Sequence, residues 1–231
     1  MKRFYKAVAV EAAEGGWQVS LDGRGIKSVG GRPQVVPTRA LAEALAAEWE
    51  QQGEEIDPAS FILRDMADFA IDVIGPDRPG TITALLRFGE GDTLLYRAEA
   101  GEPLHQRQVE RWEPLLKAAE ARWDIHFERI EGIIARPQPA ATLARLRAVL
   151  EAEDDFALSA VNTLASLAAS LTVALAALQP GSDATELWAL ANLEEDWQAE
   201  LWGSDHEAEA RRAWRLATFT AAIGFARLAR T

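Results

Sequence analysis

The segment FALSAVNTLASLAASLTVALAAL, residues 156–178, contains no charged side chain, and its interpretation decides the fold class of the chain. It is long enough for a membrane-spanning helix, which needs about 20 apolar residues. However, its residues are mainly Ala, Ser, Thr and Leu, and no basic cluster or aromatic belt flanks it. A polar stripe recurs at helical spacing, formed by Ser159, Asn162, Ser166 and Ser170. We therefore predict no membrane insertion and interpret the segment as the central helix of a helical bundle.

The residues on both sides of this segment predict further helices. Pro180-Gly181 separates the central helix from the next one, because this dipeptide favours a turn. The predicted helices cover residues 80–97, 104–123, 140–152, 156–178, 183–202 and 205–229. Residues 125–137 predict one strand, which could join a sheet at the N-terminus.

The first part of the chain has a different pattern. Hydrophobic alternation and the tight-turn pair Asp22-Gly23 predict a small antiparallel meander within residues 4–36. A helix capped by Thr38 follows, with Leu41, Leu45 and Trp49 on one face. The turn-forming residues 75–80 are the clearest break. The predicted fold class is therefore α+β: a small N-terminal domain of antiparallel strands and helices, residues 1–75, and a larger C-terminal α-helical bundle, residues 76–231.

The composition of the chain argues against several classes of function. The formal net charge of −12 repels phosphate backbones, so we expect no nucleic-acid partner. The chain has no cysteine, which excludes disulfides, thiolate metal sites and cysteine nucleophiles. The start MKRFYKAVAVEAAEGG has too few apolar residues for a signal peptide, and we expect a cytoplasmic bacterial protein.

Motifs of enzyme chemistry are missing from the sequence. Neither of the two Gly-x-Gly pairs continues into a phosphate-binding loop, and no Gly-x-Ser-x-Gly elbow occurs. No two of the three histidines have the spacing of metal ligands on a helix. We predict no catalytic residue, no cofactor and no metal. An acid-based hydrolase stays open as an alternative because carboxylates are abundant, and so does a generic helical adaptor.

Tryptophan and one acidic segment stand out instead. The chain has 8 Trp, a residue type enriched in binding hot spots. In the predicted helix 183–202, one group of residues lies within the i, i+3, i+4 neighbourhood: Glu194, Glu195, Gln198 and Trp202. Such a stripe is either a buried hydrogen-bonded network or a binding surface, and spacing alone favours a solvated or structural role.

The ordered set of motifs resembles the assembly chaperones of the alpha subunit of the F-type ATP synthase, a mitochondrial family with alphaproteobacterial relatives. The resemblance covers nearly the whole chain. In its first half it rests on RFYK at 3–6, LDGR at 21–24, EWEQQ at 48–52 and DTLLYR at 92–97. In its second half it rests on WEPLL at 112–116, LEE at 193–195 and WG at 202–203. Departures occur at residues 27–29, 61–64 and 205–206, where the family usually has other residues.

The resemblance implies a function and a set of site residues. It implies an assembly chaperone that binds the free alpha subunit and prevents its aggregation until it pairs with beta subunits. Its eukaryotic relatives act in the mitochondrial matrix. The acidic helix of the family points to Glu194, Glu195, Gln198 and Trp202 as partner-binding residues, and Trp49 is a further position with a structural or partner-binding role. We expect a monomer when the protein is free.

Overall fold

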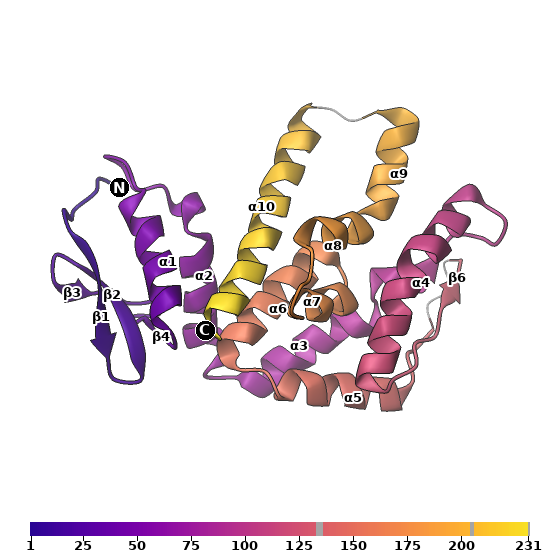
Figure 1. Ribbon diagram of the computed structural model, residues 1–231, viewed down its shortest axis with the longest axis horizontal. Coiled ribbons are helices and arrows are strands. Elements are labelled where there is room, and N and C mark those ends of the chain that lie inside the picture. The colour runs from indigo at the N-terminus through magenta and orange to yellow at the C-terminus, as the bar shows by residue number, and fades with distance from the viewer. Residues whose placement is uncertain (133–135, 204–205, 231) are drawn as a thin grey trace. The chain divides into compact units, whose positions relative to one another are not determined.

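The computed structural model describes residues 1–132, 136–203 and 206–230 and confirms the α+β class (Figure 1). Antiparallel strands lie near the N-terminus, and the remainder is mainly helical. The strands are β1 Val8–Ala13, β2 Gly16–Leu21, β3 Arg24–Gly25, β4 Val35–Val36, β5 Tyr96–Arg97 and β6 Ile130–Glu131. The α-helices are α1 Arg39–Glu50, α2 Ile62–Phe69, α3 Arg78–Glu90, α4 Pro103–Trp123, α5 Ala140–Glu151, α6 Asp155–Ala168, α7 Leu171–Ala177, α8 Ala184–Ala191, α9 Leu193–Trp202 and α10 His206–Leu228.

The chain forms two compact units. Unit 1 consists of Met1–Thr81, Asp154–Ala160 and Ala221–Thr231, and unit 2 consists of Ile82–Glu153 and Val161–Thr220. Both units therefore contain segments that are far apart in the sequence. The division after residue 75 into separate domains stays a prediction.

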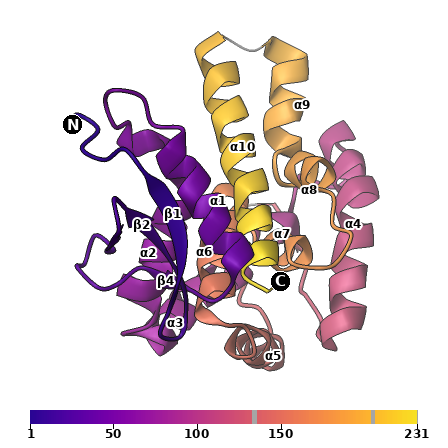
Figure 2. The same cartoon turned by 60° about the vertical axis from the view of Figure 1, so that its left-hand side comes forward.

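The N-terminal sheet of unit 1 follows the predicted meander. β1 pairs antiparallel with β2, with Val8 opposite Leu21, and β2 also pairs with β3 and β4. Asp22 and Gly23 both have positive φ, 51° and 76°, as a tight turn between twisted strands requires. The meander was predicted within residues 4–36, but its first strand begins only at Val8. α1 packs along this sheet (Figure 2).

The helix that was predicted to follow Thr38 is confirmed as α1. The Thr38 side chain accepts a hydrogen bond from the Leu41 N–H at 3.1 Å, which caps the helix. Leu41, Leu45 and Trp49 are buried on the face that packs against the sheet. A short 3-10 turn, Pro58–Ser60, then precedes α2, and a π-helical turn, Ala70–Ile74, follows it.

The predicted single helix 156–178 is wrong in one respect, because it breaks at Ala169. That residue has φ +48°, and the Ser170 side chain caps the new helix α7 by accepting from the Val173 N–H at 3.0 Å. Residues outside this segment stabilise the break. Thr93 donates to the Ala169 carbonyl, and the buried Asp92 carboxylate accepts from the Thr172 N–H at 2.9 Å. Distant residues therefore decide where this apolar segment bends.

Two other predicted helices are also shorter than expected. The helix predicted for 80–97 ends at Glu90, since Asp92 starts a 3-10 turn, Thr93–Leu95, by accepting from the Leu94 N–H. The helix predicted for 183–202 divides at Asn192 into α8 and α9. The strand predicted within 125–137 is present as β6, but it pairs in parallel with β5 and not with the N-terminal sheet.

Trp112 and Trp188 are buried in the core of unit 2. Trp112 is fully buried in α4, and its indole N–H donates to the Leu190 carbonyl of α8 at 2.8 Å. Trp188 packs against Phe219 of α10 with ring centroids 5.5 Å apart. No helix within the described residues is long and apolar enough to cross a membrane.

Candidate partner-binding surface

The residues at its two ends determine where the acidic helix α9 begins and where it stops. Asn192 closes α8 and precedes α9, and Gly203, with φ +81°, ends it by donating to the Ala199 carbonyl. The first turn of α9 carries three acidic residues, Glu194, Glu195 and Asp196. Negative charge at a helix N-terminus interacts favourably with the helix dipole. The acidic character of α9 therefore supports its local structure as well as any binding role.

One side of α9 is fixed to α4. Leu193 is buried, and Glu194 accepts a hydrogen bond from the Gln108 amide at 2.6 Å. Gln108 is fully buried and itself accepts from the Ala98 N–H at 2.8 Å. Glu194 therefore joins a buried polar contact between two helices, the structural half of the alternative that the sequence left open.

Ion pairs join α9 to both α4 and α10. Arg107 of α4 donates to both carboxylate oxygens of Glu200 at 2.6 and 2.7 Å, and its guanidinium lies over the Trp197 ring. This hydrogen bond lowers the pKa of Glu200 and raises that of Arg107. From α10, Arg212 pairs with Asp196, and Arg215 approaches Glu195 at 3.8 Å. Interactions with both neighbouring helices thus set the orientation of α9.

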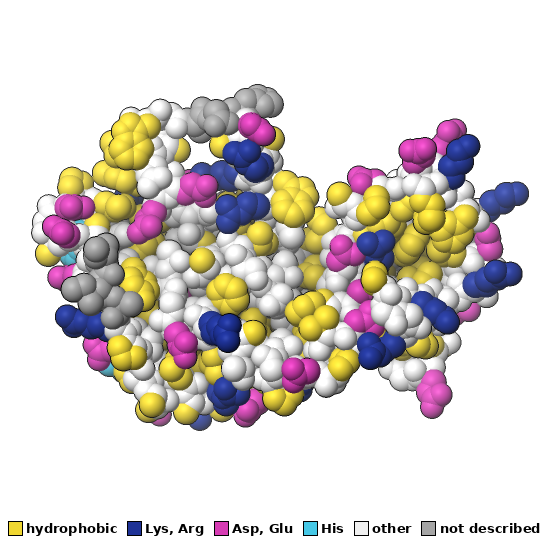
Figure 3. Space-filling view, turned by 180° about the vertical axis from the view of Figure 1, so that it is seen from behind, with side chains coloured by type: hydrophobic (Ala, Val, Ile, Leu, Met, Phe, Trp, Pro, Cys, Tyr) yellow, Lys and Arg dark blue, Asp and Glu magenta, His cyan; other side chains and the backbone are white. Residues whose placement is uncertain are grey.

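The outer face of α9, defined as Glu195, Gln198 and Trp202, remains exposed. These residues are spaced i, i+3 and i+7, which places them on one side of a helix. The exposed fraction of Trp202 is 78%, and that of the adjacent Leu201 is 56%. Trp214 of α10 is 55% exposed. Figure 3 shows hydrophobic side chains interspersed with charged ones over this part of unit 2. Three of the four predicted binding residues therefore share one surface, and Glu194 does not belong to it.

Trp49 belongs to unit 1, whereas α9 belongs to unit 2. Its exposed fraction is 9%, and its ring packs between Tyr5 and Phe61, with centroid distances of 5.6 and 4.5 Å. The Tyr5 hydroxyl donates to the Trp49 carbonyl at 2.6 Å. This burial favours the structural role among the two that the sequence left open.

Several surface residues were not predicted from the sequence. Arg107 and Arg111 of α4 line a hollow beside α9, and Arg122 lines a second hollow further along α4. Their recurrence at positions 107, 111 and 122 is a helical pattern that is visible in the sequence. The sequence does not indicate which helices face these arginines, so the signal gives no site by itself.

Carboxyl groups with a shifted pKa and clusters of metal-binding side chains are the features that would mark an enzyme site. Burial raises the pKa of the Glu48, Asp68 and Asp92 carboxyls, but each accepts hydrogen bonds from backbone N–H groups. None of the three lines the hollows along α4. Within residues 1–132, 136–203 and 206–230, no group of three or more His, Cys, Asp or Glu could hold a metal ion.

A family comparison decides how these features are interpreted. The sequence model of the ATP12 chaperone protein family matches residues 2–120, just over half of the chain. This chain belongs to the ATP12 chaperone family. Membership in an assembly chaperone family favours a binding protein over an enzyme.

The similarity of this ATP12 family member to its relatives extends over almost the whole chain. The mitochondrial protein atp12 of Schizosaccharomyces pombe is 28% identical over 219 residues, covering 90% of this chain and 75% of that protein. The crystal structure of Atp12 from Paracoccus denitrificans is 38% identical with a TM-score of 0.91, covering 99% of this chain and 98% of that one. An aspartate-to-lysine variant of the same protein gives the same values.

A third solved structure supports the same fold. A protein of Agrobacterium tumefaciens, solved as a candidate chaperone, is 38% identical with a TM-score of 0.93. The match covers 98% of this chain and 85% of that one. The helical division at Ala169 and the separate helix α9 therefore belong to a chain whose overall fold is that of solved ATP12 structures.

Proposed function

We propose that this protein is an assembly chaperone that binds the free alpha subunit of the F-type ATP synthase and prevents its aggregation until beta subunits replace it. The family membership supports this role, and the exposed outer face of α9 is the observation that carries the choice of surface. We further propose that it acts in the bacterial cytoplasm, where the alpha subunit is made, and that it performs no catalysis.

The physical requirements of such a chaperone fit the outer face of α9. A free subunit of a hetero-oligomer exposes apolar surface that otherwise promotes aggregation. An exposed tryptophan offers a large apolar contact, and tryptophan is frequent among residues whose truncation costs the most binding energy. The flanking Glu195 and Gln198 remain solvated, so the contact has a polar component, and its affinity stays compatible with later release.

Rigid support is the second argument for this surface. The inner side of α9 is fixed by Leu193, the Gln108–Glu194 hydrogen bond and the Arg107–Glu200 ion pair. Binding residues held on a fixed helix lose little conformational freedom when a partner arrives. We therefore assign Glu195, Gln198 and Trp202 to contact with the alpha subunit, and Glu194 to support of α9.

Co-purification tests the proposal directly. We would tag this protein, co-express it with the alpha and beta subunits of its own ATP synthase, and measure which subunit follows the tag. We expect selective recovery of free alpha. In the double variant Glu195→Lys, Trp202→Ala, recovery of alpha should fall at least about tenfold, because a Trp hot spot alone is worth about 2 kcal/mol or more.

The matched control is Glu90→Lys, which makes the same charge change at an exposed position of α3. Circular dichroism should match the wild type in both variants, and the unfolding midpoint of the double variant should fall by only a few degrees, because Glu195 makes one exposed contact, to Arg215 at 3.8 Å. The structure of the aspartate-to-lysine variant of the Paracoccus protein, with its unchanged TM-score to this chain, shows that one such reversal leaves that relative folded. Undiminished capture by the double variant would refute the assigned surface, and recovery of neither subunit by the wild type would refute the function.

A further inference from the structure

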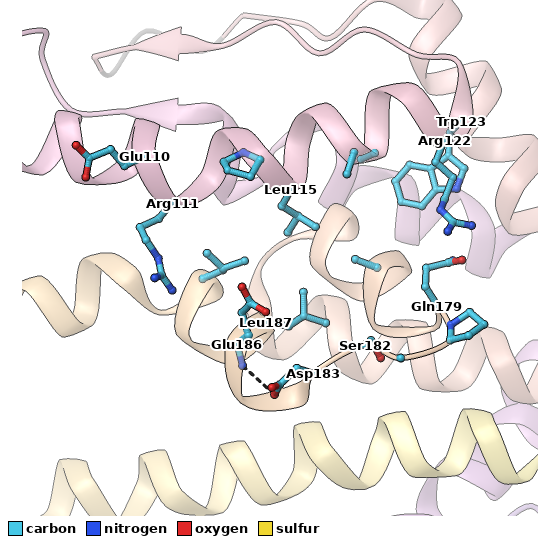
Figure 4. Close-up of a pocket in the computed structure, with 17 residues that line it drawn as sticks. Glu110, Arg111, Leu115, Arg122, Trp123, Gln179, Ser182, Asp183, Glu186 and Leu187 are labelled. Atoms are coloured by element: carbon cyan, nitrogen blue, oxygen red, sulfur yellow. Dashed lines mark hydrogen bonds between the residues drawn. The ribbon is translucent and has the colours of Figure 1, made fainter.

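A groove runs along α4 within unit 2, and the α9 surface does not account for it. Its larger part has a volume of about 490 Å³ and lies between α4 and the segment that joins α7 to α8 (Figure 4). A second hollow of about 450 Å³ continues it toward α9. Glu110 and Arg111 line both hollows, so the two hollows are adjacent along α4. We call the two hollows together the α4 groove.

The floor of the groove is apolar. Leu115 and Ala118 contribute from α4, and Leu187 and Leu190 contribute from α8. Ala118 is exposed on this surface, and its small side chain leaves room for another backbone to approach. The α4 residues that line the larger hollow run from Glu110 to Trp123, which is about 20 Å at 1.5 Å per residue. An elongated surface of this kind suits a helix better than a compact ligand.

Two cations on the α4 wall are available to a ligand. Arg111 and Arg122 are exposed and line the groove, and within the described part of the chain neither guanidinium has a hydrogen bond or an ion pair. Figure 4 shows both side chains extending from α4 on the groove side. By contrast, Arg107 at the α9 end is already paired with Glu200. Such positive charge beside an apolar floor, on a chain of net charge −12, indicates a site for a partly acidic partner.

The opposite wall has the opposite charge. Asp183 caps α8 by accepting from the Thr185 and Glu186 N–H groups at 2.8 and 3.2 Å, and the Glu186 side chain is exposed beside it. The groove thus presents Arg111 and Arg122, together with Glu110 at the α9 end, on the α4 side of its apolar floor, and only carboxylates on the α8 side. Such a distribution fixes the direction in which a charged amphipathic helix can lie, because the reversed arrangement places like charges together.

We propose that the α4 groove receives an amphipathic helix of the bound client, with acidic residues along the flank that faces α4. This inference rests on the proposed chaperone function and adds the class of segment that is recognised. Arg111 and Arg122 are eleven positions apart in α4, which is about three helical turns or 16 Å. The acidic residues of the client helix should have the same separation. Its apolar stripe covers the floor formed by Leu115, Ala118 and Leu187.

Two synthetic peptides test the groove without the alpha subunit. Both are fluorescein-labelled helices of about the length of α4 with a Leu/Ala stripe. One carries Glu at two flank positions three turns apart, and the other carries Lys there. Fluorescence anisotropy should show that the Glu peptide binds about tenfold more tightly, since two exposed attractions are exchanged for two repulsions. The negative net charge of the chain attracts the Lys peptide. Tighter binding of the Glu peptide would therefore have to come from the local arginines.

Matched variants locate the binding. Arg111→Glu with Arg122→Glu should reverse the peptide preference, and Lys117→Glu, on the same helix but outside the groove lining, should not. Ala118→Trp should fill the groove and abolish binding of both peptides. Ala121→Trp, at an exposed α4 position that does not line the groove, is its control. Equal binding of both peptides by the wild type, or unchanged binding after Ala118→Trp, would overturn the proposal.

The same variants in the alpha co-purification separate the two hypotheses. If the wild type recovers alpha and Ala118→Trp recovers much less, the groove is the client site. If both recover alpha equally, the groove proposal fails and the chaperone proposal stands. If the wild type recovers no alpha but distinguishes the peptides as expected, the groove binds acidic amphipathic helices and the identity of the client is wrong.

Discussion

At the scale of single residues, a charge cluster joins β5 and β6 to α4. Arg129 donates to Glu113 at 3.0 Å and also pairs with Glu120, and Arg97 donates to Glu113 at 3.1 Å. The Arg129 hydrogen bond lowers the pKa of Glu113. Burial opposes ionisation of Glu120, yet its bonds to Arg129 and to the Phe127 N–H bring its pKa below the ordinary value. Both carboxylates are thus more acidic folded than unfolded.

The pH dependence of stability follows from these directions. A depressed folded pKa adds stability that is complete above the unfolded pKa of about 4.3 and is lost as pH falls through the folded value. We expect Arg129→Gln to be less stable than the wild type at neutral pH, and the difference in unfolding free energy should shrink below about pH 4.3. Urea unfolding at a series of pH values measures it. A difference independent of pH would mean that Arg129 acts through packing alone.

At the scale of elements, the junction of α6 and α7 shows how tertiary interactions override helix propensity. The segment is rich in alanine, the best helix former, yet it turns at Ala169 in the left-handed region. Ser170 is fully buried, and its side chain caps α7. The Asp92 carboxylate and Thr93 hold the junction from the preceding 3-10 turn. The cost of the bend is offset by these hydrogen bonds.

Ser170→Ala tests this account. The substitution leaves the buried Val173 N–H without its acceptor, so we expect a loss of about 1–2 kcal/mol in the free energy of unfolding. Ser166→Ala makes the same chemical change at an exposed position of α6 and should be within about 0.5 kcal/mol of the wild type. Both values come from chemical denaturation. Equal effects of the two substitutions would show that the cap contributes nothing.

At the scale of the whole molecule, the negative charge bears on self-association. The chain carries a net −12, which disfavours contact between two copies. Among the described residues of unit 2, the large apolar side chains that are most exposed are Leu201, Trp202 and Trp214. A stable dimer normally buries about 1,600 Å² in total around an apolar centre, whereas these three side chains come from only two helices, α9 and α10. We therefore keep the expectation that the free protein is monomeric.

Light scattering after size-exclusion chromatography measures this directly. We expect a mass near 25.3 kDa for the purified chain at physiological salt. Twice that mass would contradict the prediction. If Trp202→Ala then restored the monomer, the outer face of α9 would be the self-association surface, and the alpha subunit would have to compete with a second copy for it.

Elements whose signals are local could be predicted from the sequence. The Thr38 cap, the α1 stripe of Leu41, Leu45 and Trp49, and the Asp22-Gly23 turn all depend on neighbouring residues, so they could be read directly. The α+β class followed from the change of period along the chain. The acidic group in α9 was also visible, because its members lie within a few helical turns of one another.

Features that depend on distant partners became visible only in the three-dimensional structure. It separated Glu194, hydrogen-bonded to Gln108 across 86 positions of the sequence, from the exposed Glu195, Gln198 and Trp202. It placed the break at Ala169, which the earlier turn at residues 92–95 stabilises. It also placed α4 opposite α8, and arginines of α4 therefore border an apolar groove. Local periodicity fixes which residues share a helix face, but the free energy of packing against other elements decides which face becomes buried, paired or open.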